Sequence, residues 1–405
     1  MSTQLPASLS EETVRTLSDE RDEPEWLREA RLDAFAALDD LDLPDVIQTP
    51  GRRWTNLEAL DYEELVDPLN AAERKDLVAP DDVAVLPFGE AAADDEYAEV
   101  LREYFGTVVE PQTNYLTALS VALFTSGTLV YVPEGTDAED VKIRTEMNSR
   151  SLFNHTLVVT EANSSVTILE RQSTGDADRD GMGLFSGLVE VAAGENSYVQ
   201  YGALQNLDEG TYNVSRKHGD ADTYATINFI EGNIGSRLTR SDIEVDLAGD
   251  SSESQIVGAF FGHDDQHFDV NARVWHHGEH TTADLVTRGV LDDEARSVYE
   301  GVQDVGRDAW DTSSFQRENT LMLSDDAEAD ASPKLIINNH DTEASHAATV
   351  GQVDREDLFY MTSRGISEEQ ARNTLVEGFF VPVLEEIAVD ELRDDLRELI
   401  SARLR

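Results

Sequence analysis

Five of the nine histidines in this chain fall between residues 263 and 280, and histidine is the side chain best suited to bind metals or move protons near neutral pH. They are His263, His267, His276, His277 and His280. A zinc-protease helix would need His-Glu-x-x-His, which is absent. Gly278 and the neighbouring threonines indicate strand or turn, where residues four apart lie about 13 Å from each other. We therefore interpret these histidines as side chains stacked along strands and hydrogen-bonded to threonine or backbone, with a metal site as the alternative.

A further histidine, His346, lies in the segment Asn338–Gly351, between the last expected strand and the C-terminal helices. Small residues flank it on both sides, so its imidazole is not crowded. A neutral imidazole at the edge of a domain is a competent iron ligand. From these features alone, His346 is either an iron ligand or a structural histidine that closes the end of the β region.

Several other chemistries are excluded. The chain has no cysteine, which rules out disulfides, cysteine-based zinc sites, a thiolate nucleophile and an all-cysteine iron–sulfur site. It also lacks a Gly-x-x-x-x-Gly-Lys-Ser/Thr loop and a Gly-x-Ser-x-Gly elbow, so neither an ATPase site nor a serine-hydrolase site is recognisable.

The elements that must position these residues are short β-rich runs, which begin near Ala122 and are separated by Gly, Asn, Asp or Ser every 8–12 residues. Alternation within each run places one face inward. Even spacing without long crossover helices leaves a sandwich, a barrel or a β-solenoid, and more than ten strands are many for one sandwich. The expected strands are Thr128–Val132, Thr156–Val159, Ser165–Leu169, Gly187–Val191, Tyr198–Tyr201, Thr223–Phe229, Asp242–Leu247, Gln255–Phe261, Phe268–Val274, Ala283–Val290 and Lys334–Asn338.

Both ends of the chain have helical patterns. Near the N-terminus we expect helices after Ser10 and over Trp26–Leu41, and then short helices and loops over 61–96. These observations predict an N-terminal helical region at 1–120, a β core at 121–350 and a C-terminal helical region at 351–405.

The C-terminal region divides into three expected helices. Asp354 can cap a helix that stops at Gly365. Ser367 and Gln370 form a capping box for a second helix, which we expect Pro382 to bound. Asp390–Leu404 carries the apolar stripe of a third amphipathic helix.

The charge of the chain restricts its partners and its habitat. Asp plus Glu total 83 against 31 Lys plus Arg, which gives a formal charge of −52. Such a surface excludes binding to nucleic acid or to anionic lipid. Acidic excess with only four lysines indicates a salt-rich cytoplasm, where molar salt screens self-repulsion; a surface for a basic partner is the alternative. No apolar run of 18 residues occurs, and Met1–Pro6 does not resemble a signal peptide, so we expect a cytoplasmic protein.

Several long motifs resemble those of the SufB/SufD family of iron–sulfur cluster assembly proteins. They occur in the correct order, and strong matching covers about 270–380, whereas 1–120 is mostly unmatched in detail. The segments are Glu23–Leu27, Ala283–Gly301, Asn319–Asp330, Ser345–Asp354 and Leu358–Ile366.

The resemblance implies a right-handed parallel β-helix flanked by N- and C-terminal helical parts. It implies a non-enzymatic scaffold subunit that pairs through the end of its β-helix, as a SufB–SufD heterodimer or as a homodimer. The C-terminal helices of such proteins bind the ATPase SufC, whose nucleotide-driven dimerisation is thought to open the cluster-building interface. No cofactor would be bound permanently, and a transient iron–sulfur cluster would be shared with SufB.

The resemblance also assigns candidate residues. The motif Ala344-Ser345-His346 looks like SufD, although many members carry a cysteine where this chain has Ala344. His346 then matches the histidine thought to contribute at the interface, with SufB supplying the thiolate. For SufC docking we expect the helix pair from Asp354 to Phe380, unless its apolar faces pack on the β-helix end. The candidates there are Leu358, Phe359, Arg364, Gly365, Leu375 and Phe379.

Two alternatives remain. A degenerate, homodimeric SufB-like protein would have a storage or regulatory role. A β-helix enzyme that acts on polysaccharides would use acidic side chains on one face of the solenoid, and that reading predicts secretion.

Overall fold

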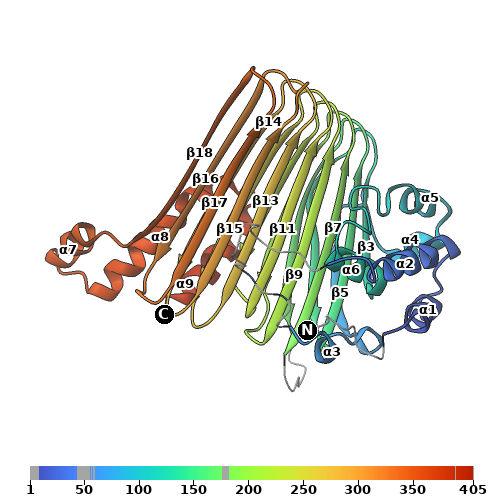
Figure 1. Ribbon diagram of the computed structural model, residues 1–405, viewed down its shortest axis with the longest axis horizontal. Coiled ribbons are helices and arrows are strands. Elements are labelled where there is room, and N and C mark those ends of the chain that lie inside the picture. Colours follow the sequence, from blue (N-terminus) through green and yellow to red (C-terminus); the bar gives the residue numbers. More distant parts are fainter. Residues whose placement is uncertain are drawn as a thin grey trace.

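The computed structural model of the chain describes residues 9–42, 55, 57, 60–175, 182–387 and 389–404. Met1–Pro6, on which the absence of a signal peptide was argued, lies outside the described residues. The described chain is a β-solenoid of about 8 turns with helical parts at both ends, as Figure 1 shows.

Two nine-stranded sheets face each other across the lumen of the solenoid. The chain crosses from one sheet to the other after nearly every strand, so that consecutive strands of one sheet are two apart in sequence. The first sheet is ordered β1 (Glu73–Val78), β4 (Asp137–Met147), β6 (Ser165–Thr174), β8 (Tyr198–Asn206), β10 (Thr226–Asn233), β12 (Glu253–Gly262), β14 (Thr282–Leu291), β16 (Thr312–Met322) and β18 (Thr342–Gln352).

The second sheet lies opposite the first, and its strands follow one another in the same direction along the solenoid. Its order is β2 (Ala84–Pro87), β3 (Ser126–Val132), β5 (Ser151–Thr160), β7 (Gly183–Ala193), β9 (Thr211–Ala221), β11 (Leu238–Leu247), β13 (His267–His276), β15 (Arg296–Val305) and β17 (Glu328–Ile337). All neighbours are parallel except β1 with β4 and β2 with β3, which are antiparallel. These two antiparallel strands correct the expectation of short helices and loops over 61–96. They start both sheets at the N-terminal end.

The turns explain the regular spacing of the strand signals. Many of the corners place one residue in the left-handed region, which Asn and Asp tolerate better than other side chains. Examples are Asn163, Asn196, Asp264, Asp293 and Asp311. Inside, alternate residues of each strand meet in an apolar core that includes Val158, Val191, Phe229, Val245 and Phe268.

The N-terminal helices pack beside the first turns of the solenoid, where they share a second core with β3, β5 and β7. They are α1 (Glu11–Glu20), α2 (Glu25–Ala37), α3 (Tyr62–Leu65), the 3₁₀ turn η2 (Pro68–Asn70), α4 (Phe88–Ala93), α5 (Asp95–Tyr104) and α6 (Tyr115–Leu123). The expected cap of the first helix is confirmed, because the Ser10 hydroxyl accepts a hydrogen bond from the amide of Thr13.

Two of the three C-terminal helices cover the outer face of the first sheet. They are α8 (Glu368–Glu386) and α9 (Asp390–Arg403), and α7 (Arg355–Ser363) precedes them. Leu392 and Leu396 of α9 lie against Gly202 and Gly232, where a Cβ atom would come within 2.3 Å and 2.9 Å of those leucines. The glycines therefore let α9 approach the sheet closely.

The expectation that Pro382 bounds the second helix is wrong, because Pro382 lies inside α8, which continues to Glu386. Val383 and Leu384 beyond it are buried against the solenoid. Packing of this last turn therefore outweighs the hydrogen bond that proline removes.

Candidate functional site

Both sheets end together at the C-terminal end of the solenoid. β18 is the last strand of the first sheet and β17 the last strand of the second, and among the described residues no strand pairs with the outer edge of either. Apolar side chains are exposed there, with Ile336 43%, Ile337 41% and Val350 40% accessible to solvent. An exposed edge with apolar side chains is a template for pairing with another chain.

His346 lies on β18 rather than between the last strand and the helices, which corrects the expectation from sequence. Its Cα partner on β16 is Gln316. Because strands alternate and Gln316 faces the lumen at 1% exposure, His346 also stands on the lumen face. His346 itself is exposed, since no described strand follows β18 in that sheet.

The lumen side chains that are paired in register with His346 change from apolar to polar along the solenoid. Ile256 on β12 pairs with Leu285 on β14, Leu285 with Gln316, and Gln316 with His346. The inner two are part of the apolar core, whereas the outer two are polar. The lumen therefore becomes polar in its last two turns.

Glu318, beside Gln316 on β16, is the titratable group of this polar end. Its side chain is 2% exposed, and burial raises its pKa to about 7, although the Thr320 hydroxyl donates a hydrogen bond to Oε1 at 2.5 Å. Its other oxygen, Oε2, has no hydrogen-bond partner among the described residues. Sequence reasoning missed Glu318 and Gln316 because Thr312–Met322 was not among the expected strands.

Two other buried glutamates of the lumen, Glu231 and Glu170, have partners that compensate their negative charge. Glu231 pairs with Lys217, which holds its pKa below the usual value despite burial. Glu170 accepts hydrogen bonds from Asn154 at 3.3 Å and from the Tyr201 hydroxyl at 2.8 Å, and the charge of Lys75 lies close by. Both carboxylates therefore have a cation nearby.

The histidines at 263–280 do not converge on one point. His276 bonds Thr281 at 2.8 Å and Gln303 at 3.0 Å, and His267 bonds Thr55 at 3.1 Å, in keeping with the expected role in a β structure. The other three bond aspartates instead: His263 with Asp264, His277 with Asp246 and His280 with Asp311.

One of these histidines has two acidic neighbours. Within the described residues, His263, Glu209 and Asp264 bring three ligand atoms within 4.8 Å of one another at the surface. Arg403 also pairs with Glu209 there, at 3.3 Å.

The six candidates for docking an ATPase differ in how far they are exposed. Phe359, Arg364 and Gly365 belong to α7 and the turn after it, where Phe359 is 74% exposed and Arg364 lies 5.0 Å from the Tyr360 ring. The described part of α7 has no buried residue, and Figure 1 shows the helix standing away from both sheets. Leu358 and Leu375 are half-buried.

Phe379, the sixth candidate, packs against the solenoid. The Arg288 guanidinium lies 4.9 Å from its ring centroid and donates to its backbone carbonyl.

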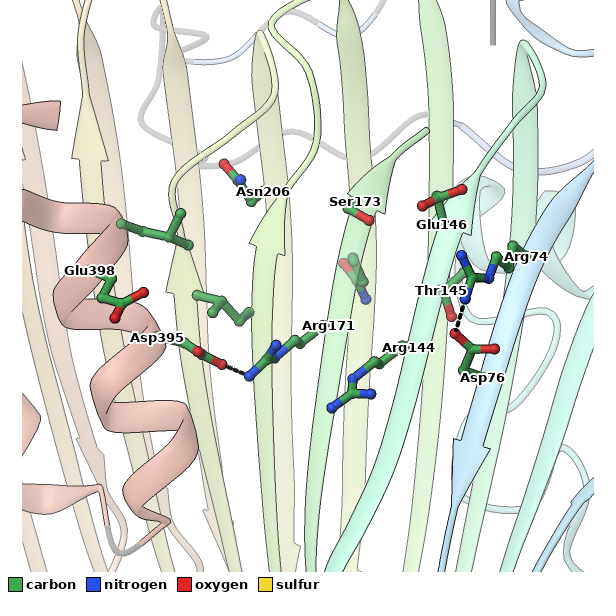
Figure 2. Close-up of a pocket in the computed structure, with 13 residues that line it drawn as sticks. Arg74, Asp76, Arg144, Thr145, Glu146, Arg171, Ser173, Asn206, Asp395 and Glu398 are labelled. Carbon is green, nitrogen blue, oxygen red and sulfur yellow. Dashed lines mark hydrogen bonds and ion pairs between the residues drawn. The ribbon is translucent and has the colours of Figure 1, made fainter. Parts of the chain in front are cut away.

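A polar groove of about 380 Å³ lies between α9 and the strands β1, β4 and β6, and Figure 2 shows its lining. Arg74, Arg144 and Arg171 reach into it; Arg74 pairs with Asp76 of β1, and Arg171 pairs with Asp395 of α9. Beside the groove, α9 makes further ion pairs with the sheet through Glu391. Glu391 meets Lys142 at 2.5 Å, Arg171 at 2.8 Å and Arg144 at 3.4 Å. The hydrogen bond from Lys142 lowers the pKa of Glu391, and Arg171 acts in the same direction. These ion pairs add to the apolar contacts that Leu392 and Leu396 of α9 make with the sheet.

Comparison with known proteins identifies the family. Residues 143–379, more than half of the chain, match the family described as "SUF system FeS cluster assembly, SufBD core domain". The chain belongs to the SufB/SufD family. The matched residues include the polar end of the lumen and His346 on the open edge.

Named relatives extend the match of this SufB/SufD family member over nearly its whole length. It is 29% identical to the iron–sulfur cluster assembly protein SufD of Bacillus subtilis, over 98% of each chain. It is 25% identical to SufB of the same organism, over 94% of this chain and 90% of the relative. It is also 26% identical to a SufBD family protein of Synechocystis, over 99% and 94%. These relatives support a role in iron–sulfur cluster assembly, and the chain is more similar to SufD than to SufB.

None of the described helices is both long enough and apolar enough to cross a membrane.

Proposed function

We propose that this chain is a non-enzymatic scaffold subunit of a SUF iron–sulfur cluster assembly complex, which pairs with SufB through the open end of its solenoid. The observation that carries the proposal is the coincidence of two unpaired sheet edges and an exposed imidazole at one end of the molecule. A second solenoid end can continue both sheets, because no described strand pairs with β17 or β18 on that side.

The side chains that this chain offers as ligands for an iron–sulfur cluster require a second subunit. The chain has no cysteine, so it cannot hold an iron–sulfur cluster with its own thiolates. His346 contributes a nitrogen ligand to iron at the interface, and SufB contributes the thiolate. The cluster is then a transient product shared by two chains, and no cofactor is bound permanently.

The ATPase SufC docks on α7 and the turn that follows it. Phe359 and Tyr360 are the large apolar side chains that α7 exposes, and an aromatic anchor suits a protein interface. Phe379 instead supports the docking helices by packing on the solenoid. The complex works in a salt-rich cytoplasm, to which the −52 charge is suited.

The test is association of the full-length chain with SufB and SufC, isolated from a high-salt lysate. Ile337→Arg places a charge on the exposed edge and should abolish pairing with SufB while SufC still co-purifies. Val78→Arg is the matched control, because Val78 is similarly exposed on β1 at the opposite end of the first sheet and should leave pairing intact.

Two results would contradict the proposal. Self-association alone, without SufB, would favour the homodimer with a storage or regulatory role. Unimpaired pairing of Ile337→Arg would move the interface away from the open end. A polysaccharide-acting enzyme is the weaker candidate, since the SufD and SufB relatives match nearly the whole chain.

A further inference from the structure

Two histidines converge on one carboxylate on the outer face of the second sheet. His218 of β9 lies with its Nε2 atom 2.8 Å from Oδ2 of Asp246 on β11, and His277, in the turn after β13, lies with its Nε2 atom 3.0 Å from Oδ1 of the same residue. Ligand atoms around a metal ion with bonds of about 2.0–2.2 Å keep separations of about 3 Å from each other. The two distances therefore match those between neighbouring ligands of one ion.

A second carboxylate lies directly beside the first. Asp220 on β9 pairs in register with Asp246, and both face outward because Val245, the neighbour of Asp246, points into the core. Like charges directly opposite each other on neighbouring strands are unfavourable. In keeping with this proximity, burial and then the charge of Asp246 raise the pKa of Asp220. A cation between the two aspartates would relieve their repulsion.

The described residues supply no Lys or Arg to this group. Asp246 forms ion pairs only with the two histidines, and no described Lys or Arg forms an ion pair with Asp220. The nearest carboxylate along β11 is treated differently, since Glu244 has Arg216 at 2.9 Å. The pair of aspartates is thus a place on this face where a bound cation can supply the missing positive charge.

The two imidazoles differ in how firmly they are held. His218 is only 12% exposed in its side chain, and its ring lies 6.3 Å from the ring of Trp275. His277 is 56% exposed and lies in a turn. Because the two nitrogens approach different oxygens of Asp246, one ion is bound by both only when His277 rotates toward His218, and its exposure permits that rotation.

The other cluster of histidine and carboxylates is less suited to a metal ion. Glu209, His263 and Asp264 bring three ligand atoms together, but the Arg403 guanidinium already lies 3.3 Å from Glu209. A cation there would meet the positive charge of the arginine. This contrast favours the group around Asp246.

We propose that His218, His277, Asp246 and Asp220 bind a divalent first-row metal ion, with zinc as the occupant. Two imidazoles and two carboxylates form a mixed nitrogen and oxygen set of the kind that zinc prefers. The ion ties together β9, β11 and the turn after β13. Two further strands of the second sheet, β15 and β17, lie between β13 and the open edge, so the site is separate from the end of the solenoid.

The test uses the full-length chain without a histidine tag, stripped of metal with a chelator and titrated with Zn²⁺ in equilibrium dialysis near neutral pH. Molar KCl in both chambers suppresses nonspecific binding of cations to the acidic surface. Wild type should bind one Zn²⁺ that His277→Gln and His218→Gln bind about tenfold or more weakly, since even changes outside the ligand shell cost roughly 10–100-fold.

A matched control and a second readout sharpen the result. His263→Gln removes a histidine that also lies beside two carboxylates and should bind Zn²⁺ as wild type does. Because an ion that binds only the folded chain stabilises it, Zn²⁺ should raise the thermal midpoint of wild type and of His263→Gln but not of His277→Gln. His277 is exposed in a turn, so this variant keeps the test valid if His218→Gln folds poorly.

Equal Zn²⁺ binding by wild type, His218→Gln and His277→Gln would overturn the site, as would a wild-type chain that binds no Zn²⁺ specifically. A loss in His263→Gln as large as in His277→Gln would place the ion at the other cluster and would also overturn it. These measurements involve neither SufB nor SufC, so their outcome is independent of the proposed function.

Discussion

His346 on β18 lies opposite Gln316 on β16, and this pairing puts an exposed imidazole at the end of a column that is apolar further inside the solenoid. The relationship depends on strand register. A slip of one residue would turn His346 to the outer face and move Glu318 out of the lumen. The polar end of the lumen is therefore fixed by the same register that buries the apolar core.

The docking surface proposed on α7 gives the first prediction. Phe359→Asp should abolish co-purification of SufC, because it replaces a largely exposed aromatic anchor by a charge, and it should leave the thermal midpoint nearly unchanged. Tyr224→Asp is the control, since Tyr224 is also an exposed aromatic residue but lies in the turn between β9 and β10. Retention of SufC by Phe359→Asp would place the ATPase elsewhere.

Two substitutions in α9 distinguish apolar packing from ion pairing as the interaction that attaches this helix to the sheet. Leu396→Ala should lower the free energy of unfolding by about 2–5 kcal/mol, since Leu396 is buried against Gly232. Glu391→Gln should cost under about 1 kcal/mol, because its ion pairs are partly exposed and screened. Guanidinium unfolding curves of both variants in molar KCl measure the difference. A larger loss for Glu391→Gln would show that charge, and not packing, holds the helix.

Salt should stabilise the fold. With a formal charge of −52, self-repulsion is strong in dilute buffer and screened in molar salt. We expect a higher midpoint of thermal unfolding in about 3 M KCl than in about 0.1 M KCl. Equal midpoints would remove the argument for a salt-rich cytoplasm and favour a basic partner for the acidic surface.

Acid should destabilise the protein through His276. Burial lowers the pKa of this histidine to about 4, while Gln303 accepts its Nε2 proton. The unfolded chain protonates below its ordinary pKa of about 6.5, whereas the folded chain resists, so stability falls as the pH drops from about 6.5 to 4. The contribution is at most roughly 3 kcal/mol.

Chemical unfolding at several pH values measures this contribution. His276→Gln should flatten the slope between pH 6.5 and 4, whatever its effect at neutral pH. His340→Gln, in the exposed turn before β18, should keep the wild-type slope. An unchanged slope in His276→Gln would mean that His276 titrates normally in the fold.

Sequence patterns predicted the β-solenoid only as one of three β architectures, and the family resemblance decided among them. Strands with buried, alternating apolar residues, such as β6 and β12, were found easily. β18 was missed because Ala344, Ala347 and Ala348 carry no apolar alternation, and its strand conformation comes from pairing with β16. β1 and β2 were missed for a related reason, since both are short and only half-buried on one face.

The candidate site was predictable in part. His346 could be selected from its setting and from the resemblance, but its place on the lumen face depends on register. Glu318 and Gln316 gave no signal, because one buried glutamate cannot be distinguished from a surface one in a chain with 83 acidic residues. The buried Glu318 stands out only beside Glu170 and Glu231 in the folded row, because no described cation forms an ion pair with it, whereas those two have one nearby.

The most direct test is the yield of iron–sulfur cluster by the complex reconstituted with SufB and SufC, measured as acid-labile sulfide and visible absorbance. His346→Ala should keep the fold and the partners but lose cluster formation. His340→Ala, a nearby exposed histidine, should match wild type. Undiminished cluster yield from a fully assembled His346→Ala complex would contradict the role assigned to the open end of the solenoid.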